Sequence, residues 1–281
     1  MIDIYTEIRK RYGNVKRGRG YYLYTEKNVR LLDLYLDGGM SILGRKTGQF
    51  NLAAKQFLDR GLTGFFPTKA EYQLEKAVKA AVPDYPVIRW YASIEKARTH
   101  LYTAYGYDRQ SAVPLWRPFL CDTTADAVLL TSVYPSPYGF VAAKQANSLL
   151  PPSDPLFPPL AWSIARAFFD LQRQLDRKDE AQRAAPVHRK KNTESRRQRQ
   201  MFETLVQPLW EQKACYLFPK IDQSSYTALF YAALESHILL SPSYHEPSIL
   251  PELPSYTQCI GFLRRYLSAA GVISVITAPN C

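Results

Sequence analysis

The residues VIRWYASIEKA, at 87–97, have the pattern of a buried strand that turns directly into a helix. The free backbone N–H groups of a helix N-terminus bind phosphate, and the helix dipole favours the negative charge. In such a turn we expect glycine, which permits close approach, and a hydroxyl group. Ser93 supplies a hydroxyl, but Ile94 and Glu95 occupy the next two positions. The junction therefore resembles a phosphate site in its backbone but not in its side chains.

Other residue types that commonly carry chemistry form no recognisable constellation. The four histidines include no H-x-x-x-H pair and the four cysteines no C-x-x-C pair, so no metal site and no redox dithiol are predicted. The sequence also has no G-x-S-x-G, no P-loop and no G-x-G-x-x-G. Metal, nucleophilic and dinucleotide chemistry are therefore poorly supported.

Composition predicts a compact globular protein. The chain has 281 residues, of which 46% are hydrophobic, and this is enough to bury one large core or two smaller ones. Its N-terminus is charged at once, and no run approaches the roughly 18 uninterrupted apolar residues that a membrane-spanning helix needs. We therefore expect a soluble, cytoplasmic protein with no membrane association.

The net charge of +11 is concentrated in one segment. Residues 183–199 carry seven Lys or Arg against the single Glu194, with no aromatic residue among them. Because single-stranded nucleic acids usually stack on aromatic side chains, a solvated linker and helix face is the favoured interpretation. A specific nucleic-acid site is not expected here, and nucleic-acid binding is kept as a weaker alternative.

Hydrophobic periodicity predicts the elements that position the junction. They are a hairpin at 20–35, helices at 50–60 and 69–81, a strand at 87–91, a helix at 93–105 and an apolar strand at 127–133. Strand, helix and strand in this order indicate an α/β layer with parallel strand pairing.

The second half of the chain begins with a proline-rich stretch. Residues 136–159 are predicted to form a loop region with one short helix at 144–150. A long amphipathic helix follows from about Leu160. The remaining predictions are a helix at 192–210, a strand at 215–218, a helix at 225–237, a strand at 238–240 and a last helix through 260–267.

Five stretches, in order, resemble one enzyme family. They are GRGYYLYTEKNVRLLDLYLDGGMSILG, DRGLTGFFPTKAEYQLEKAV, IRWYASIEKARTHLYTAYGYDR, PYGFVAAKQANSLLPP with PPLAWSIARAF, and YTALFYAALESHILLSPSYHEPSIL. Together they are similar to the class III (fold-type I) pyridoxal-phosphate-dependent aminotransferases, and most closely to glutamate-semialdehyde aminomutase. The resemblance covers most of the chain.

The resemblance implies an α/β fold with a truncated large domain and a small α/β domain made by both ends of the chain. The expected domains are 1–50 and 192–281 for the small domain, 51–178 for the reduced large domain, and 179–191 for a basic linker. A homodimer is implied as well, because the family builds its active site between two subunits.

Several residues that the family needs have no counterpart. Between Arg109 and Asp126 lie only 16 residues, where the family carries the Asp that pairs with the pyridinium nitrogen and the aromatic residue that stacks on the ring. The Schiff-base lysine falls at Leu130 or, with small shifts, at Thr131 or Ser132. No lysine occurs from 127 to 143, and a hydroxyl group cannot form an imine.

Lys144 is the nearest lysine to that position in the sequence. The predicted helix at 144–150 places it beyond the site, so it is interpreted as a solvated helix residue.

The resemblance also locates the expected cofactor phosphate. In the family, a Ser-Gly-Thr turn holds the cofactor phosphate. Ser93 matches the Ser of this turn, while Ile94 replaces the Gly and Glu95 replaces the Thr. A phosphate-binding Thr from the partner subunit falls at Asp154. These positions and Ser132 are the candidates for a vestigial site, and no catalytic or cofactor-binding residue is predicted. In an alternative alignment, shifted by a residue or two, Glu95 simply faces solvent.

The sequence therefore predicts a degenerate aminotransferase-like protein without a cofactor. It would act as a binding or interaction module for an unidentified protein or small-molecule partner. The alternative is a divergent pyridoxal-phosphate-dependent aminotransferase or aminomutase that uses another lysine.

Overall fold

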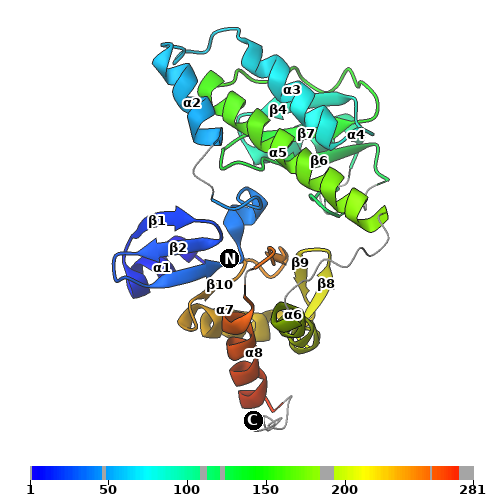
Figure 1. Cartoon of the computed structure of the whole chain (residues 1–281). Helices are drawn as coiled ribbons and strands as arrows, with labels where there is room; N and C mark the ends of the chain where they lie inside the picture. Colours follow the sequence, from blue (N-terminus) through cyan, green and yellow to red (C-terminus); the bar gives the residue numbers. More distant parts are fainter. Residues whose placement is uncertain are drawn as a thin grey trace. The chain divides into compact units, whose positions relative to one another are not determined.

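The computed structural model describes residues 2–45, 49–107, 113–120, 124–183, 193–253 and 255–271 of the chain. The chain divides into two compact units, one of Met1–Gly38 with Pro186–Cys281 and the other of Gly39–Ala185 (Figure 1). The first unit thus combines both ends of the sequence, and the second is continuous. Both contain helices and sheets, which confirms the predicted α/β class.

The first unit contains a four-stranded sheet that joins the two ends of the chain. Its elements are α1 (Ile4–Tyr12), β1 (Val15–Arg19), β2 (Tyr22–Thr25), β3 (Arg30–Asp33) and β10 (Ile238–Leu239), in the strand order β1-β2-β3-β10. The hairpin predicted at 20–35 is confirmed by β2 and β3, whereas α1 and β1 are absent from the sequence prediction. β10 pairs in parallel with β3, so the C-terminal segment extends the N-terminal sheet.

A second sheet, a short 3₁₀ helix and three α-helices belong to the described part of this unit. They are η1 (Leu36–Gly39), α6 (Thr193–Val206), β8 (Trp210–Lys213), β9 (Tyr216–Pro219), α7 (Gln223–Glu235), β11 (Ser248–Ile249) and α8 (Thr257–Ala269), with the strand order β11-β9-β8. The predicted helices of this region are confirmed with slightly shifted ends. Side chains from α1, α7, α8 and the first sheet form one core, in which Leu31 and Leu229 are fully buried.

The second unit contains a mixed sheet in which the predicted parallel pairing is wrong. Its strands are β4 (Val87–Tyr91), β5 (Leu115–Trp116), β6 (Ala127–Thr131) and β7 (Gly139–Ala143), in the order β4-β7-β6-β5. β4 and β6 run in the same direction, but β7 lies between them and is antiparallel to both. Only the short β5 pairs in parallel with β6 among these strands.

β7 falls within the stretch predicted to be a loop. Its five residues, GFVAA, are all buried, so they show no alternation of polar and apolar residues. Prolines on both sides dominate the local sequence pattern and conceal the strand. A buried central strand of small residues is therefore the element that sequence periodicity could not identify.

The short helix predicted at 144–150 is also wrong. The segment contains bends and turns, and side chains hold it to neighbouring backbone. Lys144 Nζ donates to the carbonyl of Thr124 (2.7 Å), and the Asn147 side chain accepts from the N–H of Leu149 (2.9 Å) and donates to the carbonyl of Ala104. These bonds satisfy the backbone locally without a helix.

Helices cover both faces of the mixed sheet (Figure 1). They are α2 (Gln49–Asp59), α3 (Lys69–Ala81), α4 (Ile94–Tyr105) and α5 (Pro158–Arg183). α4 packs on β6 and β7, where Leu129 and Val141 belong to its apolar cluster. Phe140, on the opposite face of β7, contacts Phe168 of α5 (ring centroids 5.8 Å apart), and α5 packs against α2 and α3. Since neighbouring residues of a strand point to opposite faces, the sheet lies between α4 and the other helices.

A close backbone contact at the start of α4 gives a stability test. A Cβ atom on Gly139 would lie 2.6 Å from the Cα of Ile94 and 2.8 Å from the Cβ of Ala97. We expect Gly139→Ala to lower the free energy of unfolding by about 1–3 kcal/mol, because backbone must shift to admit the methyl group. Denaturant unfolding measures this change.

The matched control adds the same methyl group where there is room. A Cβ atom on Gly261, inside α8, would meet its nearest neighbour, Arg265 Nη1, at 3.8 Å. Gly261→Ala should leave stability unchanged or raise it by up to about 1 kcal/mol. Equal effects of the two substitutions would contradict the close packing of α4 on β7.

Candidate functional site

The predicted strand-to-helix junction is confirmed and is capped by its own serine. β4 ends at Tyr91, and α4 begins at Ile94 with Ser93 as its N-cap. The Ser93 Oγ accepts a hydrogen bond from the backbone N–H of Lys96 (3.1 Å). Serine is a favoured N-cap because its oxygen satisfies one of the unpaired N–H groups of the first turn. The hydroxyl therefore serves the helix itself.

A carboxylate from a distant loop takes another backbone N–H of this turn. Asp154 Oδ2 accepts from the backbone N–H of Ala92 (2.8 Å). The Nζ of Lys96 donates to both carboxylate oxygens of Asp154, at 2.7 and 2.8 Å. The structure thus brings Asp154 and the Ser93 turn together within one chain, whereas the resemblance assigns the matching contact to a partner subunit.

Main-chain bonds hold the Asp154 loop along β4. The N–H of Asp154 donates to the carbonyl of Trp90 (3.0 Å), and the indole Nε1 of Trp90 donates to the carbonyl of Asp154 (2.8 Å). The Tyr91 hydroxyl donates to the carbonyl of Pro151 (2.8 Å). The carboxylate is therefore placed by a fixed loop rather than by a freely moving side chain.

The surroundings of Asp154 favour its charged form. Partial burial raises the pKa of the carboxyl group, but the hydrogen bonds from Lys96 and Ala92 and the charge of Lys96 outweigh it. The net effect is a pKa below the ordinary value. At neutral pH a negative charge therefore lies against the positive end of α4.

Ile94 and Glu95, which the resemblance aligns with the family's Gly and Thr, have different surroundings. Ile94 is partly buried and packs against the cluster of α4 and the sheet, which includes Ala97 and Leu101. Glu95 is exposed, and its carboxylate forms no hydrogen bond or ion pair with a described residue. Its backbone carbonyl accepts from Thr99 Oγ1 (2.9 Å). Ile94 is thus part of the core, and Glu95 stands in solvent.

The hairpin between β6 and β7 lies at the same end of the sheet as the turn. Thr131 pairs with Gly139, and Gly139 pairs with Tyr91. Ser132 follows directly and is 1% exposed, with its Oγ accepting from the N–H of Tyr134 (3.1 Å). Leu130, the ungapped match to the Schiff-base lysine, is fully buried. The apolar core of the sheet therefore contains that position.

Lys144 lies at the other end of the sheet. The turn after Tyr91 adjoins Gly139, the first residue of β7, whereas Lys144 follows the last residue. At about 3.3 Å per residue, the strand separates Lys144 from the turn by roughly 16 Å. Its Nζ is held by the Thr124 carbonyl and lies 3.8 Å from Asp126. Lys144 is thus directed away from the candidate site.

The lysine that does reach the turn is Lys96, which the sequence reasoning missed. Its side chain lies in the first turn of α4 and is about half exposed, at 46%. The signal available in the sequence was its place three residues after the N-cap Ser93. That spacing returns a side chain to the same end of the helix.

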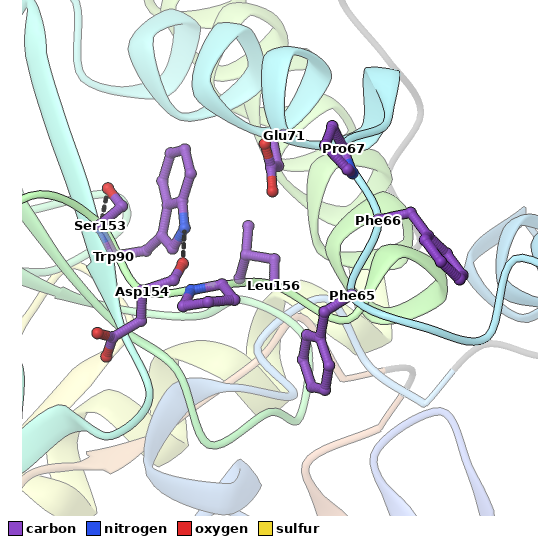
Figure 2. A pocket seen from close by; sticks show the side chains of 9 residues that line it. Phe65, Phe66, Pro67, Glu71, Trp90, Ser153, Asp154 and Leu156 are labelled. Carbon is purple, nitrogen blue, oxygen red and sulfur yellow. Dashed lines mark hydrogen bonds between the residues drawn. The ribbon is translucent and has the colours of Figure 1, made fainter.

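A pocket opens beside this turn, on the Trp90 side of the loop (Figure 2). Its volume is about 310 Å³. We call it the Trp90 pocket, and its lining residues are Phe65, Phe66, Pro67, Glu71, Trp90, Ser153, Asp154, Pro155 and Leu156. In Figure 2 the Asp154 carboxylate points away from the pocket centre, and the Glu71 carboxylate points towards it.

Some sequence predictions concern residues outside the described part of the chain. These include most of the basic segment at 183–199, with His188, Arg189, Lys190 and Lys191, and two cysteines, Cys121 and Cys281. Within the described residues, no cluster of three potential metal-ligating side chains occurs, and no helix has the length and apolar character needed to cross a membrane. The described Cys259 is buried, and burial raises its pKa to about 12.

A curated protein matches most of the chain. The chain is 40% identical over 295 aligned residues to this uncharacterized protein of Treponema pallidum, with 92% of this chain and 95% of the relative aligned. A shorter match is 29% identical over 100 residues to glutamate-1-semialdehyde 2,1-aminomutase of Saccharolobus islandicus. That match covers 35% of this chain and 24% of the enzyme. No known protein-family model matches the chain.

Solved structures show the same fold at low sequence identity. The ornithine aminotransferase of Toxoplasma gondii superposes with a TM-score of 0.61 over 96% of this chain and 96% of its own, at 10% identity. The fold is that of the class III aminotransferases, as the sequence resemblance implies. In the segment between Arg109 and Asp126, the described residues contain the two-residue strand β5.

The ion pair at the turn gives a pH-dependent test. Asp154→Asn should lower the free energy of unfolding by about 1 kcal/mol at pH 7, because asparagine keeps an acceptor but loses the charge. The folded pKa of Asp154 is below its ordinary value, so its contribution is complete above the unfolded pKa of about 3.9 and is lost as the pH falls through the folded pKa. The difference between wild type and variant should therefore shrink below about pH 4. Urea unfolding at several pH values measures it.

An exposed carboxylate in the same unit provides the control. Asp126 is 85% exposed and lies 3.8 Å from Lys144. Asp126→Asn should change the free energy of unfolding by less than about 0.5 kcal/mol at every pH. An Asp154→Asn variant that behaves in the same way would show that the ion pair contributes little.

Proposed function

Because the chain belongs to one family with the Treponema pallidum protein and has the fold of the class III aminotransferases, we propose that it is a degenerate aminotransferase-like protein. In this proposal it performs no pyridoxal-phosphate chemistry and serves as a binding or interaction module. The observation that carries the proposal is the hydrogen bond from Ala92 N–H to the Asp154 carboxylate. This bond places a negative charge beside the Ser93 turn, where the resemblance places the cofactor phosphate.

The charge of Asp154 opposes a bound phosphate. Two unit negative charges about 4 Å apart, at an effective dielectric constant of about 20, repel each other by about 4 kcal/mol, and the Lys96 ammonium beside Asp154 offsets part of this repulsion. A phosphate would also have to displace the Asp154 side chain from both Ala92 and Lys96. Charge-assisted hydrogen bonds of this kind contribute about 1.5–3 kcal/mol each before allowance for exposure. The residues at the turn therefore do not fit the cofactor phosphate.

The positions around the turn also lack a suitable nucleophile. Imine formation needs an uncharged amine, and the Lys96 ammonium donates to both oxygens of Asp154. Leu130, which the resemblance aligns without gaps with the Schiff-base lysine, is fully buried. The missing phosphate ligand and the missing amine support the same proposal independently.

A divergent pyridoxal-phosphate-dependent aminotransferase or aminomutase is the second candidate. The specific observation in its favour is that Lys96 lies at the turn, where the resemblance places the cofactor. In this candidate, Lys96 would have to leave Asp154 before it could react. The two candidates therefore differ in whether a cofactor forms a covalent bond to one lysine.

We further propose that the protein works in the cytoplasm as a homodimer. The dimer is proposed because the family it resembles places its active sites between subunits, and the cytoplasmic location because the aminotransferases that share this fold are soluble proteins. Neither proposal depends on retained catalytic activity.

Cofactor trapping separates the two candidate functions. The protein is incubated with pyridoxal phosphate, reduced with borohydride and mapped by peptide mass spectrometry. We expect a colourless protein in which trace labelling is spread over exposed lysines and is the same in Lys96→Arg and Lys144→Arg. A yellow protein whose adduct is concentrated on one lysine peptide, and lost when that lysine is replaced, would favour the enzyme instead.

Light scattering tests the proposed assembly. The chain has a mass of 32.2 kDa, so a homodimer should have twice this mass. We expect that value at micromolar concentration, and we expect it to persist through a tenfold dilution. A mass near that of the single chain throughout the dilution series would refute the homodimer.

A further inference from the structure

The Trp90 pocket is bounded by apolar side chains from three segments: the loop before α3, strand β4 and the Asp154 loop (Figure 2). Leu156 is 1% exposed, and the Trp90 indole is held in place by its bond to the Asp154 carbonyl. Phe65 and Phe66, on the loop before α3, are 69% and 57% exposed. These two rings are therefore largely accessible at the rim.

One charged group is directed into this apolar space. Glu71 lies in the first turn of α3, and Figure 2 shows its carboxylate pointing towards the pocket centre. It has no hydrogen bond or ion pair with any residue that the structure describes. The other carboxylate of the lining, Asp154, points away and is bound by Lys96. The lining contains no Lys, Arg or His, so the charge of the pocket is negative.

We propose that the Trp90 pocket binds a small organic cation, an alkylammonium or alkylguanidinium. Its charged group would lie against the Glu71 carboxylate, and its apolar part would contact Trp90 and Phe65. Aromatic rings attract cations through their negative faces, and an unpaired carboxylate adds direct charge complementarity. The volume of about 310 Å³ is at the lower end of the range for small-molecule sites. This inference rests on the proposed function and deepens it by naming the class of ligand.

The same features disfavour other ligand classes. An anion would meet the Glu71 charge without a basic residue in the lining to offset it. A neutral alkyl compound would gain the apolar contacts but would leave the carboxylate without a partner. The pocket should therefore discriminate by charge among ligands of equal size.

Three probes of equal chain length test this discrimination on the full chain. They are n-pentylammonium, n-pentanol and pentanoate, and binding is followed by the indole N–H resonance of Trp90 in NMR spectra. We expect n-pentylammonium to shift this resonance and to bind at least tenfold more tightly than n-pentanol. Pentanoate should cause no saturable shift. Equal affinity for the ammonium and the alcohol, or no shift with any probe, would overturn the proposal.

Variants of α3 identify the responsible carboxylate. Glu71→Gln should weaken n-pentylammonium binding at least tenfold. Glu75→Gln is the matched control, because Glu75 lies one turn further along α3 and pairs with Lys79 (2.7 Å) outside the pocket lining. It should leave the affinity unchanged. Equal affinities of the two variants for the probe would overturn the role of Glu71.

A third variant covers the case in which Glu71→Gln impairs folding. Phe65→Leu removes the aromatic face at a mostly exposed position and keeps an apolar side chain. It should weaken the ammonium more than the alcohol, and an equal loss for both would contradict the cation–π contact.

The outcomes for the pocket and for the proposed function can be distinguished. A failure of every probe without a borohydride-trapped adduct would overturn the ligand class alone. A specific adduct would overturn the proposed function.

Discussion

The contact on which this site depends is the seating of the Asp154 carboxylate at the start of α4. A helix N-terminus presents unpaired N–H groups and a partial positive charge, and something must satisfy both. In this chain the Ser93 hydroxyl accepts from the N–H of Lys96 in the first turn. The Asp154 carboxylate accepts from the N–H of Ala92, just before the helix, and supplies the charge. Because the same loop bonds to Trp90 through main-chain groups, the contact also fixes one wall of the Trp90 pocket. The turn and the pocket are therefore two consequences of one loop position.

α4 lies very close to the sheet at the end where the Ser93 turn is found. β7 begins with Gly139, whose missing side chain lets α4 lie directly on the strand. Ala142 and Ala143 end the same strand and are fully buried. This close packing leaves Ile94 as part of the helix–sheet contact, so an isoleucine at the position of the family's glycine is explained by packing. The substitution that looks damaging for phosphate binding is favourable for the core.

Local sequence signals predicted the elements whose polar and apolar residues are well separated. The helix at 93–105, the helix at 69–81 and the hairpin around β2 and β3 each have a helical period or a turn signal of their own. β7 has none of these, because all its residues are buried and prolines surround it. Its omission led to the wrong pairing of β4 with β6. Non-local pairing of this kind leaves no trace in the periodicity of either partner strand.

The candidate site was predictable in its location but not in its contacts. The alignment placed Asp154 opposite the Ser93 turn of a partner subunit, whereas the structure brings the two together within one chain. It gave no reason to expect Lys96 as the partner, since an ion pair between residues 58 positions apart depends on the path of the loop. Glu95 shows the converse, because the alignment gave it a role at the turn and the structure leaves it in solvent. A sequence shows which residue type stands at a position, whereas the direction of its side chain is known only from the structure.

The distribution of charge around Trp90 links the turn to the neighbouring pocket. On one side of the loop, the Asp154 carboxylate is paired with Lys96 and lies at the N-terminus of α4, so little unbalanced charge remains there to attract a ligand. On the other side, Glu71 is directed into an apolar space without such a partner. At the Ser93 turn, Asp154 already supplies the negative charge that the helix N-terminus favours. In the pocket, the Glu71 carboxylate favours a cation. The charge of a small molecule that binds beside Trp90 should therefore be set by Glu71 rather than by the Ser93 turn.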